Sequence, residues 1–209
     1  RQEAQWVCQE ILRRIDGGEA AYSDFAVLFR AAHLSRFIEQ ALIRANIPYV
    51  MWGGVRFFER MEIKDCISYL RLVASDDDLA FERVINTPSR KVGKTTLELI
   101  TAYASQEGTT LYQALKNHLD DKKLNRDALH EFVALIEECR SRAYSMGVCA
   151  MLEYILEKTG LKQEYRDDND EQRLENITEL VDSIRLYESE HTEWEQLPLY
   201  DYLQDIALY

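Results

Sequence analysis

The segment Arg83–Lys94, with the sequence RVINTPSRKVGK, carries the residue types best suited to binding an anion. It contains four basic residues and no acidic one, although the whole chain has a formal net charge of -12. The four basic residues are Arg83, Arg90, Lys91 and Lys94. A short, purely basic segment inside an acidic protein predicts contact with a negatively charged ligand.

The residues Val92-Gly-Lys-Thr95 match the end of a nucleotide-binding P-loop, but the rest of the segment does not. The motif GxxxxGK[ST] needs glycine at its first position so that the backbone can curl around a phosphate. That position is Pro88, which has a fixed φ and no N–H. The preceding residues, FERVIN, favour a helix where the motif requires a strand. We therefore expect no nucleotide site here and no cofactor in this chain.

A helix-hairpin-helix fits the same segment better. A helix over 79–85 is expected to stop at Asn86–Pro88, and Gly93 would supply a tight turn with positive φ before the next helix. The N–H groups of residues 92–95 would then lie free at a helix N-terminus, where anions are favoured. Lys91 and Lys94 would add charge for phosphate contacts. The alternative is an ordinary surface loop between core helices.

Three further basic residues are candidates. Lys64 and Arg71 are seven residues apart on an expected helix, so both project from the side away from its apolar stripe. Arg30 follows the apolar run 25–29, and the ends of buried strands commonly carry ligand contacts. The alternatives are simple solubility for the pair and a carboxylate-paired surface charge for Arg30.

The distribution of charge, cysteines and apolar residues argues against a metal-binding protein and against a membrane protein. Residues 164–205 contain 14 acidic and 3 basic residues, a net charge of -11, so the other residues carry 22 basic and 23 acidic, a net charge of -1. The acidic run is typical of a solvated helical face. The cysteines are too far apart to predict a metal site, and buried reduced thiols are expected. The absence of a long apolar run predicts a cytoplasmic protein with no membrane partner.

The hydrophobic pattern predicts two regions. Helical spacing over 4–15 and 34–45 alternates with apolar runs at 25–29 and 48–51, which predict buried strands, so residues 1–54 are expected to be a short α/β fragment of a parallel-sheet domain. Residues 55–209 are expected to be all-α, which makes the fold mainly α. The helices predicted in that region cover 63–73, 79–85, 96–103, 127–142, 150–158 and 172–187.

The chain resembles the UvrD/PcrA/Rep-type superfamily 1 DNA helicases. The resemblance is carried by FAVLFRAAHLSRFIEQALIRANIPYVMWGGVRFFERMEIKDCISYLRL and by DDDLAFERVINTPSRKVGKTTLELI. It implies an ATP-driven motor that moves 3′ to 5′ on single-stranded DNA and unwinds duplex. Residues 1–54 would be the N-terminal part of the RecA-like domain 2A, and residues 55–209 the inserted helical 2B domain. Because the ATPase motifs are absent, ATP and Mg would belong to the parent protein, and this fragment alone would be inactive.

The resemblance also implies particular contacts. Arg30 matches a residue that contacts single-stranded DNA, and Lys64 and Arg71 match basic positions on a duplex-facing helix; Arg36 is a further candidate. The segment matching the family's duplex-gripping hairpin comprises Arg90, Lys91, Val92, Gly93, Lys94, Thr95 and Thr96. Lys91 stands where the family has the first glycine of that hairpin.

The implied partners are duplex DNA and its junctions with single strands, together with repair or transcription proteins. The rival hypothesis is an autoregulatory and protein-interaction domain with little DNA affinity of its own.

Overall fold

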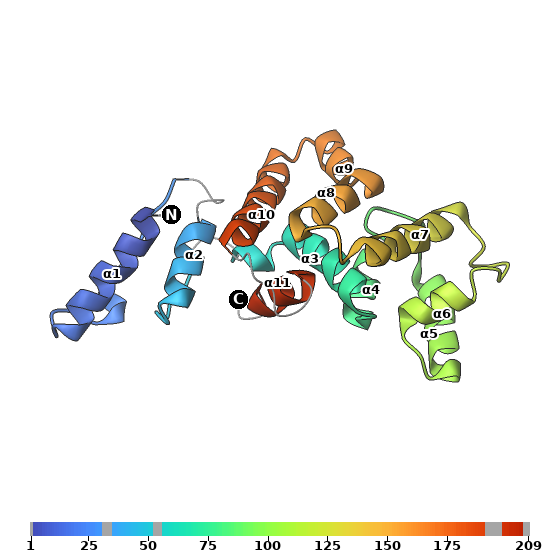
Figure 1. Cartoon of the computed structure of the whole chain (residues 1–209), viewed down its shortest axis with the longest axis horizontal. Helices are drawn as coiled ribbons and strands as arrows, with labels where there is room; N and C mark the ends of the chain where they lie inside the picture. The colour runs from blue at the N-terminus through green and yellow to red at the C-terminus, as the bar shows by residue number, and fades with distance from the viewer. Residues whose placement is uncertain (1, 31–34, 52–55, 191–197, 207–209) are drawn as a thin grey trace. The chain divides into compact units, whose positions relative to one another are not determined.

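A computed structural model describes residues 2–30, 35–51, 56–190 and 198–206. The chain divides into two compact units between Ile63 and Lys64, and each is described by itself. The regular secondary structure of the described residues is entirely helical (Figure 1). The expectation of a mainly α protein is therefore confirmed. None of the helices in the described ranges is long and apolar enough to cross a membrane.

The first unit is built on two packed helices, α1 (Gln2–Asp16) and α2 (Ser35–Arg44), with 3-10 turns at Tyr22–Asp24 and Phe57–Glu59. Its buried centre consists of Cys8 and Ile11 of α1, Leu42 of α2, and Ile47. The Glu39 carboxylate ties the following loop to α2, because it accepts hydrogen bonds from the backbone N–H of Phe57 at 3.2 Å and from the Tyr49 hydroxyl at 3.3 Å.

The two strands expected in this unit are not present in the structure. Residues 25–29 and 48–51 are described without regular secondary structure. A strand needs a partner strand for its backbone N–H and C=O groups, and the described residues contain no such pairing. Phe25 and Tyr49 instead pack against the α1–α2 core. The rest of these runs is largely exposed, with Leu28 93% and Val50 75% exposed, so the burial expected for them is not observed.

Helices α3, α4, α6 and α7 form one half of the second unit, and α3 begins at the end of the first. Their bounds are Met61–Ala74, Asp78–Val84, Leu111–Asn117 and Asp127–Arg142. A buried aromatic cluster joins them: Phe81 lies 6.2 Å from Phe132 and 6.5 Å from Tyr112, and Tyr69 lies 6.5 Å from Phe132, between ring centroids. Aromatic pairs at these separations add stability beyond the area they bury.

The other half contains α8, α9, α10 and α11, with bounds Val148–Thr159, Leu161–Asp167, Glu171–Glu190 and Pro198–Ile206. Helix α10 packs along α8 and α9 (Figure 1). The Glu188 carboxylate of α10 accepts hydrogen bonds from the N–H groups of Val148 and Cys149, which are unpaired donors at the N-terminus of α8. A Cβ at Gly147 would lie 2.6 Å from a Glu188 carboxylate oxygen, so a larger residue there would displace this carboxylate from the N-terminus of α8.

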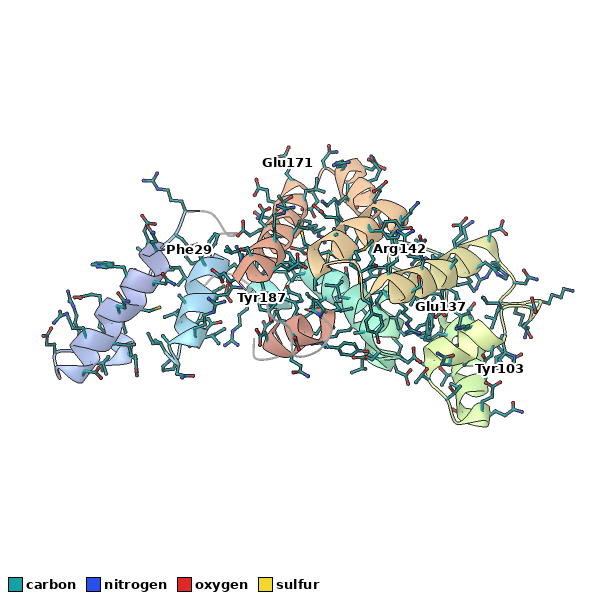
Figure 2. All side chains as sticks on the ribbon, viewed as in Figure 1. Phe29, Tyr103, Glu137, Arg142, Glu171 and Tyr187 are labelled. Atoms are coloured by element: carbon teal, nitrogen blue, oxygen red, sulfur yellow. The ribbon has the colours of Figure 1, made fainter. Side chains whose placement is uncertain are left out.

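Part of the acidic run of the C-terminal region lies on the outer face of α10. Ile177, Leu180 and Ile184 are buried, whereas Glu171, labelled in Figure 2, and Asp182 are exposed. On α10, this alternation agrees with the solvated helical face predicted for the acidic run. The cysteines, Cys8, Cys66, Cys139 and Cys149, are all free and buried, as expected.

Candidate nucleic-acid interface

The basic segment forms the connection between α4 and α5 (Lys94–Glu107). Helix α4 begins at the side chain of Asp77, which accepts a hydrogen bond from Ala80 N–H at 3.0 Å, and its C-cap is Ile85. The segment before the loop is therefore helical, as the argument against a P-loop required. We define residues 86–93 as the hairpin loop.

The Asn86 side chain shapes the hairpin loop from within. Its Oδ1 accepts hydrogen bonds from the backbone N–H of Arg90 at 2.8 Å and of Val92 at 3.1 Å. Asn favours such turns because its short side chain can replace a backbone acceptor. Val92 is itself buried. The N–H of Val92, which we had expected to be free for phosphate, is therefore already used inside the loop.

Arg90 points into the protein. Its Nη1 donates to the carbonyl oxygens of Val84 at 2.9 Å, Ile85 at 3.2 Å and Pro88 at 3.2 Å. The carbonyls of Val84 and Ile85 end α4 and lack helical partners, and a cation is favoured at that end of a helix. The guanidinium also stacks over Phe132, with 4.8 Å between its carbon and the ring centroid. The geometry thus assigns Arg90 to the C-terminus of α4.

Tyr69 of α3 holds the other side of Arg90. Its hydroxyl accepts a hydrogen bond from Arg90 Nη2 at 2.8 Å and donates one to the Thr87 carbonyl. Burial raises the pKa of Tyr69 to about 12, so the hydroxyl stays a donor throughout the physiological range. The side chain is completely buried. Tyr69 therefore fixes the loop against α3 without reaching the surface.

The turn of the hairpin loop lies at Lys91. Lys91 has φ of 56°, in the left-handed region, whereas Gly93 has φ of -89° and ψ of 178° and caps α5 in an extended conformation. The expectation that Gly93 supplies the positive φ is therefore wrong: the turn comes two residues earlier. Arg126 donates from Nη1 to the Lys91 carbonyl at 3.0 Å and holds the turn in place.

What remains at the surface is a small set of groups at the start of α5. Lys91, Gly93, Lys94 and Thr95 are exposed, and the Lys94 side chain is 90% exposed. Within the described hairpin, no hydrogen bond joins the N–H groups of Gly93, Lys94 or Thr95 to another part of the chain. Thr96 is half-buried, and its N–H bonds to the Gly93 carbonyl at 3.0 Å. Two lysines and the first turn of a helix are thus presented together.

The four basic residues of the segment therefore have different roles. Arg83 forms an ion pair with Asp65 at 2.7 Å, and Arg90 caps α4. Lys91 and Lys94 remain as surface charges, with only an exposed pair between Lys94 and Glu98 at 3.9 Å. Exposed pairs of this kind contribute little and are easily exchanged for another anion. The anion-binding capacity of the segment lies in its two lysines.

Lys64 and Arg71 form a separate basic feature on α3. They are the exposed positions among residues 62–73, all of which the structure describes, and the rest of that stretch is buried. With Ser68 and Ser75 they follow helical spacing along one narrow stripe. From 3.6 residues per turn, Tyr69 points about 130° away from this stripe. Lys64 and Arg71 thus lie on a different side of α3 from Tyr69, the residue that contacts the hairpin loop.

Arg30 and Arg36 belong to the first unit, whereas the hairpin loop belongs to the second. Arg30 is exposed. Arg36 is 2% exposed, with its guanidinium carbon 4.3 Å from the centroid of the Phe37 ring. In this structure Arg36 is a packing residue of the first unit.

Sequence reasoning missed the residues that support the hairpin loop. Tyr69, Arg126 and Phe132 lie 21, 35 and 42 residues from their loop partners, so no local pattern signals them. Asn86 could have been found, because Asn just after a helix and before proline is a frequent turn residue. No group of potential metal ligands occurs among the described residues.

Residues 1–209 match the family described as UvrD-like helicase C-terminal domain. The chain is 37% identical over 213 residues to DNA helicase II of Escherichia coli, covering 99% of this chain and 29% of that protein. It is 39% identical over 190 residues to DNA helicase II of Haemophilus influenzae, covering 88% and 26%.

A third relative is the ATP-dependent DNA helicase PcrA of Staphylococcus aureus, which is 34% identical over 216 residues, covering 100% of this chain and 29% of the relative. The chain thus spans less than a third of the length of these relatives. With a family match over its full length, the chain belongs to the UvrD-like helicase C-terminal domain family.

Proposed function

We propose that this chain is an accessory DNA-binding module of an ATP-dependent 3′–5′ DNA helicase. It grips duplex phosphates ahead of the motor during unwinding. The observation that carries the proposal is the rigid hairpin loop, which turns Arg90 inward and leaves Lys91, Lys94 and the first N–H groups of α5 at the surface. The names of the relatives, which are DNA helicases, make DNA the anion to expect.

The chemistry of this surface suits a phosphate of the DNA backbone. Free N–H groups at a helix N-terminus together with the helix dipole favour an anion, and two nearby ammonium groups add charge. Such contacts fix position and carry affinity, but they do not read bases. We interpret α4, the hairpin loop and α5 as the helix-hairpin-helix expected from the sequence. Lys64 and Arg71 would supply a second phosphate-contacting stripe on α3.

In the parent helicase, residues 1–54 would be the N-terminal part of domain 2A and residues 55–209 the inserted 2B domain. ATP and Mg would act in the remainder of that protein. Arg30 would face single-stranded DNA, as its exposure allows. Arg36 is not included in the proposed interface, because its side chain is buried.

The test is a titration of hairpin DNA with this chain at salt concentrations from about 50 to about 200 mM. The variant Lys91→Glu/Lys94→Glu reverses two surface charges, one in the hairpin loop and one at the start of α5. We expect weaker binding and a slope of log K against log salt that is smaller by about 1.8, since each lost phosphate contact accounts for about 0.9. The expected slope change is the quantitative signature of two phosphate contacts.

A matched control is Lys158→Glu/Arg166→Glu, which changes the charge equally at exposed positions of α8 and α9. It should leave the slope close to that of the wild type. If the two double variants behave alike, the hairpin loop has no special role in DNA binding. A chain that binds no duplex but captures another domain of the helicase would instead support an autoregulatory role.

A further inference from the structure

We propose that Tyr69 and Arg90 are positioning residues of the DNA-binding hairpin: they set the population of its binding-competent conformation and do not touch DNA. The inference rests on the function proposed above. It reassigns Arg90, whose place in a basic loop suggests a phosphate ligand, and it adds Tyr69, a residue of α3 that no sequence pattern connects with DNA.

The first observation is that Tyr69 is inaccessible. Its side chain is 0% exposed, and its ring lies in the aromatic cluster, 6.5 Å from Phe132. Its hydroxyl nevertheless makes two contacts with the hairpin loop, to the Thr87 carbonyl and to Arg90 Nη2. Any effect of this hydroxyl on DNA binding must therefore pass through the position of the loop.

The second observation is that the polar contacts of Arg90 point inward. Its two terminal nitrogens serve three backbone carbonyls and the Tyr69 hydroxyl, at distances from 2.8 to 3.2 Å. One face of its guanidinium is covered by Phe132. A phosphate could take this guanidinium only by breaking these hydrogen bonds, which would leave the Ile85 and Pro88 carbonyls without the donor that Arg90 supplies.

The third observation is that the loop is held at both ends of the turn. Asn86 Oδ1 binds the N–H groups of Arg90 and Val92, and Arg126 binds the Lys91 carbonyl. Lys91 is thereby kept in a left-handed conformation that a non-glycine residue rarely adopts on its own. Because the conformation is intrinsically unfavourable, we expect its population to depend on these tertiary contacts.

Positioning and direct contact make different predictions for salt dependence. If a residue only shifts the loop equilibrium, the apparent Kd rises in inverse proportion to the competent population. The bound complex then keeps the same phosphate contacts, so the line of log K against log salt moves down without changing slope. A direct phosphate contact, when removed, lowers the slope by about 0.9.

The experiment titrates hairpin DNA against the whole chain over a series of salt concentrations, with circular dichroism to confirm folding. Tyr69→Phe removes the hydroxyl that joins α3 to the loop. Its matched control is Tyr112→Phe, which removes another fully buried hydroxyl in the same unit, one that donates to Glu137 at 2.8 Å. Arg90→Gln tests the guanidinium, and Lys91→Glu/Lys94→Glu serves as the reference for direct contact.

We expect Tyr69→Phe to weaken binding about tenfold, the factor that corresponds to about 1.4 kcal/mol, with an unchanged slope. Arg90→Gln should also shift the line in parallel, and Tyr112→Phe should bind as the wild type does. Without DNA, the amide hydrogens of Arg90 and Val92 should exchange faster in Tyr69→Phe than in Tyr112→Phe, since their shared acceptor, Asn86, would be less well held.

Two results would overturn this inference and leave the proposed function standing. One is a salt slope reduced by about 0.9 in Arg90→Gln. The other is equal affinity of Tyr69→Phe and Tyr112→Phe for DNA, while Lys91→Glu/Lys94→Glu binds DNA weakly. If the lysine variant binds as the wild type does, the proposed function itself fails and the inference fails with it. Should Arg90→Gln not fold, the Tyr69 and Tyr112 pair still decides between the two roles.

Discussion

Replacing Lys91 by glycine should make the protein more stable and its grip on DNA weaker. The residue has φ of 56°. A side chain with a Cβ disfavours this conformation by about 1–2 kcal/mol, whereas glycine adopts it freely but loses about 0.5–1 kcal/mol more backbone entropy on folding. The net gain for glycine over alanine at this position is therefore about 1 kcal/mol.

The comparison that isolates this effect is Lys91→Gly against Lys91→Ala. Both variants lose the ammonium group, and both keep the backbone carbonyl that binds Arg126. For a domain of this size, about 1 kcal/mol corresponds to about 2–4 °C in Tm, which far-ultraviolet circular dichroism during heating can resolve. Both variants should also show a salt slope of DNA binding that is smaller by about 0.9.

The control is Ala134→Gly at an exposed position in the middle of α7. There the same exchange of alanine for glycine should cost about 1 kcal/mol, because φ is helical and the added freedom of glycine only favours unfolding. The two sites should thus respond with opposite signs. A Lys91→Gly variant no more stable than Lys91→Ala would refute the left-handed turn and the argument built on it.

Two further predictions concern the stability contributed by Arg140 and by Tyr69, both in the second unit. Arg140→Ala should lower the free energy of unfolding by about 2 kcal/mol, whereas Arg142→Ala on the same helix should lower it by less than about 1 kcal/mol. Urea unfolding measures both changes. Equal losses in the two variants would contradict this prediction. Arg140 is 23% exposed, bonds to Asp76 and the Leu72 carbonyl and stacks on Tyr112, whereas Arg142, labelled in Figure 2, is 45% exposed. Burial raises the pKa of Tyr69 from 10.0 to about 12, so its contribution to stability is complete below pH 10 and is lost as the pH rises toward 12. A plot of Tm against pH should therefore fall less steeply over this window for Tyr69→Phe than for the wild type.

Long helices with a clear apolar period could be predicted from the sequence. The bounds expected for α7, 127–142, are those observed, and α1, α3, α8 and α10 were expected within a few residues of their ends. The short helices α6, α9 and α11 were not expected. They have seven, seven and nine residues, so each offers few turns for a periodic pattern. Helix α4, also seven residues long, was nevertheless predicted, over 79–85.

The apolar runs at 25–29 and 48–51 show the opposite error. A continuous apolar run states that residues are buried and does not state against what. In the structure Phe25 and Tyr49 pack on α1 and α2, whereas Leu28 and Val50 are exposed, so the predicted burial is wrong for part of each run. Strand pairing depends on segments distant in sequence, which no local pattern supplies.

At the candidate site the exposure expected from the sequence is observed for some residues and not for others. The charges of Lys91 and Lys94 are exposed as expected, but Arg90 turns inward and Val92 is buried. Arg90 faces inward because it bonds to the nearby carbonyls that end α4 and to the Tyr69 hydroxyl of α3, an acceptor 21 residues before it that no local pattern signals. That information is tertiary.

Helix α3 offers a route for selective chemical labelling. The four native thiols are buried, including Cys66 of α3 itself at 0% exposure, and burial raises the pKa of Cys139 to about 11. Thiols in this state react slowly with electrophiles. A cysteine introduced at Lys64 or Arg71, the exposed positions among residues 62–73, would therefore react faster than the native cysteines. A fluorophore attached there would sit on a rigid helix and could report the approach of DNA, with every native cysteine left in place.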